Sequence, residues 1–93
     1  MKDAGPDDAR QFFDVANQFV ALANDLAEEH GKPRVAAAIL WAASRYGSFA
    51  WAMSGAPGRQ TPAEALELFS AQYRKMMQDN LQQMNAEFAP PKE

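Results

Sequence analysis

The chain has 93 residues, 47% of them hydrophobic and 11% aromatic, and its formal net charge is −3. This length suits one domain with a single core. The absence of cysteine excludes disulfides, thiol catalysis and thiolate metal sites. Twelve acidic side chains against nine basic ones argue against a general nucleic-acid binder, because such proteins neutralise phosphates with a basic excess.

The start of the chain, 1–6, contains acids, glycine and proline, whereas a secretory signal needs an apolar run. The most apolar stretch, 35–53, is interrupted by Ser44, Arg45 and Ser48, and it falls short of the roughly 20 apolar residues that span a bilayer. We therefore expect a cytoplasmic protein without a membrane partner.

A first helix is expected at about 7–30. Asp7 or Asp8 can cap its first amides and suits the positive end of the helix dipole. Apolar side chains recur at helical spacing on one side, and they are Phe12, Phe13, Ala16, Phe19, Val20, Leu22, Ala23, Leu26 and Ala27. Gly31 suits the left-handed residue that ends a helix, and Pro33 suits the first turn of the next one.

A second helix is expected at about 33–54. So short a connection forces it to run antiparallel to the first. It is rich in alanine, and its larger apolar side chains cover more than half of its circumference, so we expect it to lie between the other two helices. A narrow polar stripe of Arg34, Ser44, Arg45 and Ser48 remains.

The third helix is expected at about 61–87. Thr61, Pro62 and Glu64 form a capping box with proline at the first helical position. One face of this helix carries Leu66, Phe69, Tyr73, Met76, Met77, Asn80 and Met84.

These patterns predict an all-α fold of three long antiparallel helices in an up-down-up bundle. The whole chain, 1–93, is expected to be a single helical domain, with 1–6 and 89–93 as frayed tails.

The connection between the first two helices gathers charge. Glu28 and Glu29 end the first helix, while Lys32 and Arg34 begin the second, and each placement opposes its own helix dipole. We expect the opposite charges of the two pairs to offset each other across this connection, which we call the charge-clasped corner. The alternative is that the same residues form a site for a polar partner. His30, the single histidine, suits a helix C-terminus, and no nucleophile is evident beside it for a catalytic role.

Trp41 falls on the polar stripe of the second helix, beside Arg34 and Arg45. Large aromatic side chains flanked by arginine are typical of protein interfaces. We therefore predict an interaction surface formed by Arg34, Trp41 and Arg45, and a place in the core is the alternative for Trp41.

The chain resembles a group of small, mainly proteobacterial proteins known only as a domain of unknown function. The resemblance rests on Phe19–Asn24, Glu29–Gly31, Arg34–Ala38 and Ala42–Tyr46 with Phe49, and it covers about 12–81. It implies a bacterial, cytoplasmic, stand-alone helical protein, and it supplies no activity or ligand.

No catalytic, metal, nucleotide or cofactor pattern stands out in the sequence. The leading hypothesis is a non-enzymatic module that binds itself, as a dimer, or another protein. The alternative is a small-ligand binder or enzyme with a pocket near His30, Tyr46, Tyr73 and Asn80. Nucleic-acid binding through Arg34, Arg45 and Arg59 is disfavoured, because three arginines are few for an acidic protein.

Overall fold

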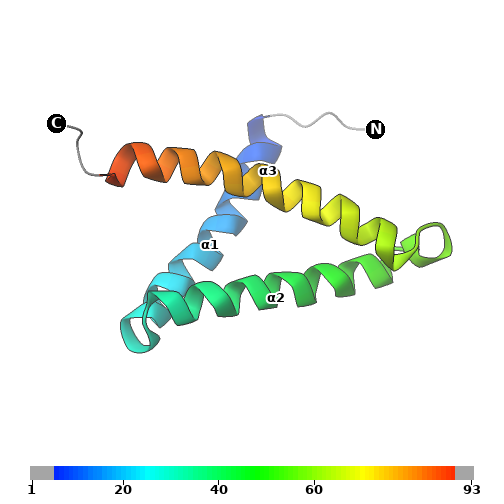
Figure 1. Cartoon of the computed structure of the whole chain (residues 1–93), viewed down its shortest axis with the longest axis horizontal. Helices are drawn as coiled ribbons and strands as arrows, with labels where there is room; N and C mark the ends of the chain where they lie inside the picture. Colours follow the sequence, from blue (N-terminus) through cyan, green and yellow to red (C-terminus); the bar gives the residue numbers. More distant parts are fainter. Residues whose placement is uncertain (1–5, 90–93) are drawn as a thin grey trace. The chain divides into compact units, whose positions relative to one another are not determined.

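The computed structural model describes residues 6–89 and consists of helices. They are α1 (Pro6–His30), α2 (Lys32–Met53), the short 3-10 helix η1 (Ala56–Gly58) and α3 (Pro62–Phe88), as Figure 1 shows. The described residues contain no strand, so the all-α prediction is confirmed. Most of the predicted tails, 1–5 and 90–93, lies outside the described residues.

The chain divides into two compact units, Met1–Phe49 and Ala50–Glu93. The first unit contains α1 and most of α2, and the second contains the end of α2, η1 and α3. The predicted single domain and the up-down-up packing concern both units together, and they stay predictions.

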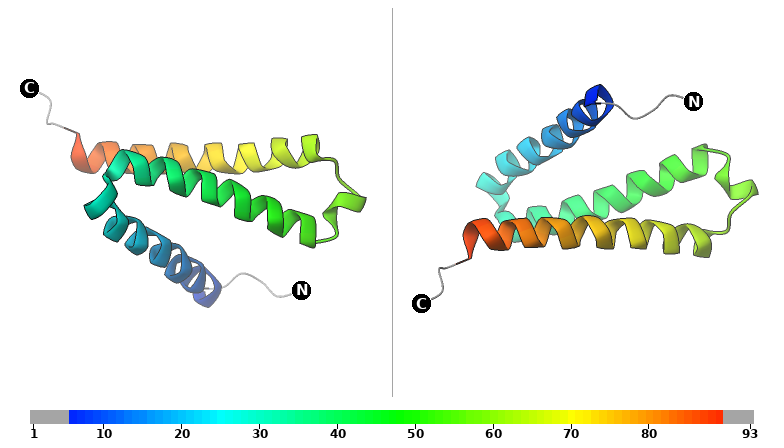
Figure 2. Two further views of the ribbon diagram at one scale, coloured as in Figure 1. Left: turned by 90° about the horizontal axis from the view of Figure 1, so that it is seen from below. Right: turned by 90° about the horizontal axis from the view of Figure 1, so that it is seen from above.

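In the first unit, one residue links α1 to α2. Gly31 has a φ of +88°, and its N–H donates to the Ala27 carbonyl oxygen at 2.8 Å, which ends α1. The Gly31 carbonyl then accepts from the Val35 N–H at 3.2 Å in the first turn of α2. The left-handed glycine predicted at this corner is therefore confirmed. The two helices meet here and spread apart with distance from the corner (Figure 2).

In the second unit, the turn between α2 and α3 is held by side chains. Trp51 Nε1 donates to Gln60 Oε1 at 2.7 Å, which ties the end of α2 to the residues before α3. Thr61 and Glu64 exchange two hydrogen bonds, of 2.9 and 3.1 Å, between side chain and backbone. This is the capping box that the sequence predicts.

Few side chains are buried in the described part of the chain. Val35 and Ala65 form its buried hydrophobic set, with exposures of 8% and 5%. The sequence predicts Phe12, Phe19 and Leu66 on inward faces, yet they are 61%, 60% and 64% exposed. In the first unit the reason is geometric, because α1 and α2 spread apart with distance from Gly31 and α2 does not cover the far part of α1.

Gly31 and Gly47 of the first unit should respond in opposite ways to alanine. Gly31→Ala places a Cβ in a left-handed conformation, and we expect it to lower the free energy of unfolding by about 1–2 kcal/mol. Gly47 lies inside α2, where the methyl group of an alanine would meet nothing within 4 Å, so Gly47→Ala should raise that free energy by about 0.5–1 kcal/mol. Urea unfolding followed by circular dichroism measures both changes. Equal midpoints for the two variants would contradict the assigned corner.

Candidate functional site

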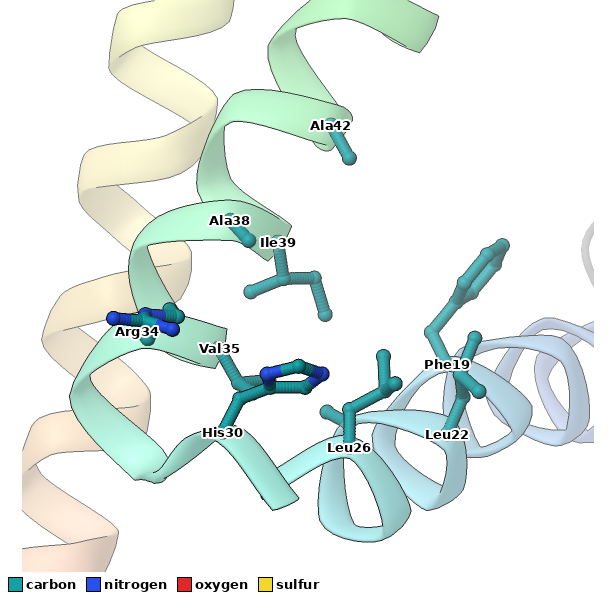
Figure 3. A pocket seen from close by; sticks show the side chains of 10 residues that line it. Phe19, Leu22, Leu26, His30, Arg34, Val35, Ala38, Ile39 and Ala42 are labelled. Atoms are coloured by element: carbon teal, nitrogen blue, oxygen red, sulfur yellow. The ribbon is translucent and has the colours of Figure 1, made fainter. Parts of the chain in front are cut away.

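An apolar groove opens between α1 and α2 beside the corner, and it encloses about 480 Å³. One wall belongs to α1 and the other to α2. Figure 3 shows Leu26 of the first wall directed toward Ile39 of the second, with Phe19 farther along α1. The residues of this corner groove are Phe19, Leu22, Ala23, Leu26, His30, Arg34, Val35, Ala38, Ile39 and Ala42.

The two walls differ in the size of their side chains. The α1 wall presents Phe19, Leu22 and Leu26, which are 60%, 55% and 41% exposed. The α2 wall includes Ala38 and Ala42, whose methyl groups leave space in front of the helix. Val35 and Ile39 line the same wall, so the space in front of α2 lies at the two alanines.

Polar groups lie at the corner end of the groove. The His30 ring stands between the two walls in Figure 3, and Arg34 lies at the edge. His30 Nε2 is 3.9 Å from Glu29 Oε1, and these side chains are 41% and 79% exposed. Such an exposed and long contact orients the ring only weakly.

The predicted charge-clasped corner contains no ion pair across the connection between α1 and α2, and the mutual offset of its charges stays a prediction. Over residues 6–89, the ion pairs are Glu29 with His30 and Lys75 with Asp79, so neither Lys32 nor Arg34 pairs with the acids across the corner. The physical reason is that an exposed pair gains little in water and must immobilise two long side chains. Whether the corner serves a partner stays a prediction.

Trp41 and Arg45 share a shallow depression on α2 with Ala42, Tyr46 and Phe49. The Trp41 side chain is 66% exposed, as its place on the polar stripe predicts. Tyr46 is 71% exposed and Phe49 is 58% exposed, so the exposure is a property of the whole depression. The tilted rings of Tyr46 and Phe49 lie 6.0 Å apart.

The predicted surface of Arg34, Trp41 and Arg45 is divided between these two hollows. Arg34 lines the corner groove, whereas Trp41 and Arg45 line the depression. Ala42 lines both, so the two hollows adjoin on α2. We call them together the hairpin face.

The alternative pocket is not assembled in the first unit, because Tyr46 does not line the groove that His30 lines. Tyr73 and Asn80 belong to α3 of the second unit. Within the described residues, no group of three or more acidic or histidine side chains is placed to hold a metal ion. None of the described helices combines the length and the apolar character that crossing a bilayer requires.

The sequence did not predict the groove itself. Its wall residues Phe19, Leu26 and Ile39 were expected to be core. The spacing of apolar residues along a helix is the same whether that face is covered or open. No sequence signal separates the two cases, because the wide apolar arc of α2 predicts that two helices cover it.

The fold defines a small all-α protein, and α1 and α2 of its first unit leave much of each other's apolar side chains uncovered. The model of the family described as "Protein of unknown function (DUF3144)" matches residues 12–84. The chain therefore belongs to this family, and the resemblance over about 12–81 is confirmed. Comparisons with curated proteins and with solved structures return no match.

The two tryptophans allow the exposure of the hairpin face to be measured. With Trp51→Phe, the remaining Trp41 should be quenched strongly by acrylamide at low protein concentration, because its ring is 66% exposed. The matched variant Trp41→Phe keeps Trp51, which is less exposed and hydrogen-bonded to Gln60, so its quenching should be weaker. Equal quenching of the two variants would contradict this assignment.

Proposed function

We propose that this protein is a non-enzymatic interaction module that associates with itself through the hairpin face. The observation that carries the proposal is the exposure of the large apolar side chains on this face. Phe19, Trp41 and Phe49 are each more than half exposed, and they belong to hollows that share Ala42. Contiguous apolar surface of this kind is typical of protein interaction sites.

The free energy of association requires a contact of many side chains and cannot come from one side chain alone. Full burial of a large apolar side chain contributes about 1.5–3 kcal/mol, so covering one that is half exposed contributes roughly 1 kcal/mol. Association itself costs about 4–15 kcal/mol in lost freedom. Side chains from both walls of the groove, and from both copies, are therefore needed together.

The proposal places this association in the bacterial cytoplasm, in keeping with the resemblance. A small apolar ligand in the corner groove is the second candidate, because about 480 Å³ falls within the range of ligand pockets. If the groove binds a small ligand, amide signals of its lining residues shift when a metabolite library is added.

Truncating a groove wall should weaken self-association. Leu26→Ala removes apolar bulk from both copies, and we expect the dimer dissociation constant to rise by about 10- to 100-fold. Sedimentation equilibrium over a range of concentrations measures it. Gln18→Ala on the polar side of α1 is the control, and it should behave like the parent. If the parent itself stays monomeric at millimolar concentration, self-association is excluded.

The depression should contribute separately from the groove. Trp41→Ala and Arg45→Ala should each shift the sedimentation profile toward monomer while the helical circular dichroism is retained. Arg59→Ala removes the same charge from the turn after η1 and serves as the control. If Trp41→Ala and Arg45→Ala sediment like the parent, the depression takes no part in the contact.

A further inference from the structure

We infer that the hairpin face is covered by the hairpin face of a second copy, with the two corners at the same end of the dimer. Each α1 then lies between its own α2 and the α2 of the second copy. This inference rests on the proposed self-association and specifies its geometry. It uses only α1 and the part of α2 in the first unit.

Side-chain size supports this order of helices. In the corner groove the α1 wall offers Phe19, Leu22 and Leu26, whereas the α2 wall combines Ala38 and Ala42 with Val35 and Ile39. Placing each α1 against two α2 helices sets its large side chains against the space in front of Ala38 and Ala42, which lets them interdigitate. Placing α1 against α1 would oppose large to large and leave the alanines facing alanines.

The charges of the two helices support the same order. From Asp7 to Glu29, α1 carries six acidic side chains and one arginine, whereas α2 carries Lys32, Arg34 and Arg45 and no acid. An alternating ring of helices therefore brings opposite net charges together at every contact. A ring with α1 beside α1 brings like charges together, which disfavours it.

The charges at the corner favour one orientation of the second copy relative to the first. Because a single residue links the helices, Glu28 and Glu29 stand at nearly the same height as Lys32 and Arg34. With both corners at one end of the dimer, Lys32 and Arg34 of one copy lie at the same height as Glu28 and Glu29 of the other. All neighbouring helices are then antiparallel, so their helix dipoles attract each other. The absence of such pairs within one chain, over the residues described, is consistent with this placement.

Turning the second copy end for end is less favourable. It would place Glu28 and Glu29 beside the end of α2, and no basic residue follows Arg45 in that helix. It would also make each α1 run parallel to the α2 beside it, so that like ends of the helix dipoles meet.

Mixing two variants with reversed charges at the corner tests this orientation of the two copies. The acid-reversed variant is Glu28→Lys with Glu29→Lys, and the base-reversed variant is Lys32→Glu with Arg34→Glu. In each variant alone, charges of the same sign meet between the two copies. At low salt the dissociation constant of its homodimer should therefore rise by about tenfold or more. In a 1:1 mixture the two variants should form a heterodimer with the affinity of the parent dimer. Sedimentation with one variant fluorescently labelled measures this affinity.

A control separates this effect from a change of net charge. Glu67→Lys with Glu87→Lys on α3 alters the net charge by the same amount as the acid-reversed variant, and it should dimerise like the parent. If the reversed variants dimerise but gain nothing from mixing, the shared-end geometry is wrong and self-association stands.

Spin-label distances give an independent answer, because single cysteines can be introduced into a chain that has none. Gln11→Cys and Asp25→Cys are exposed sites at equal distances from the middle of α1, about 21 Å apart along it. With corners at one end, labels at matching positions in two copies lie closer than Gln11 lies to Asp25 of the other copy. The reverse order would overturn the inference, and a monomeric parent would overturn the proposed function as well.

Discussion

A single left-handed residue between two long helices constrains the first unit. Gly31 reverses the chain without any further residue, so α1 and α2 meet closely at one end and diverge along their length. Val35, one turn after the glycine, is buried because it lies where the helices are closest. The apolar side chains farther from the corner have no neighbour of the same helix pair to cover them, and this produces the groove.

The composition of the two helices then gives the groove its character. From Asp7 to Glu29, α1 carries six acids and one arginine, while α2 carries three bases and no acid. A surface with these two halves is complementary to itself, which is the condition that a twofold-symmetric interface must satisfy. The proposed association of two copies therefore needs no feature beyond the hairpin itself, and the exposed indole of Trp41 would extend the proposed contact along α2.

The second unit is held by different means. Directional hydrogen bonds set its turn, through Trp51 and Gln60 and through the capping box of Thr61 and Glu64. These bonds are local in sequence, so they form without help from distant residues. The same locality explains why the start of α3 could be predicted closely from the sequence.

The sequence by itself determined the helices and their ends, because caps, glycines and helical periodicity act over a few residues. Thr61 with Glu64 and the left-handed Gly31 are examples that the structure confirms. Only the tertiary structure decided whether the apolar faces were covered. Phe19 and Ile39 have the same pattern in a closed core and in an open groove, since periodicity records which side of a helix is apolar and not what lies against it. The division of Arg34 from Trp41 likewise depends on the angle between two helices, which is a property of packing over the whole hairpin.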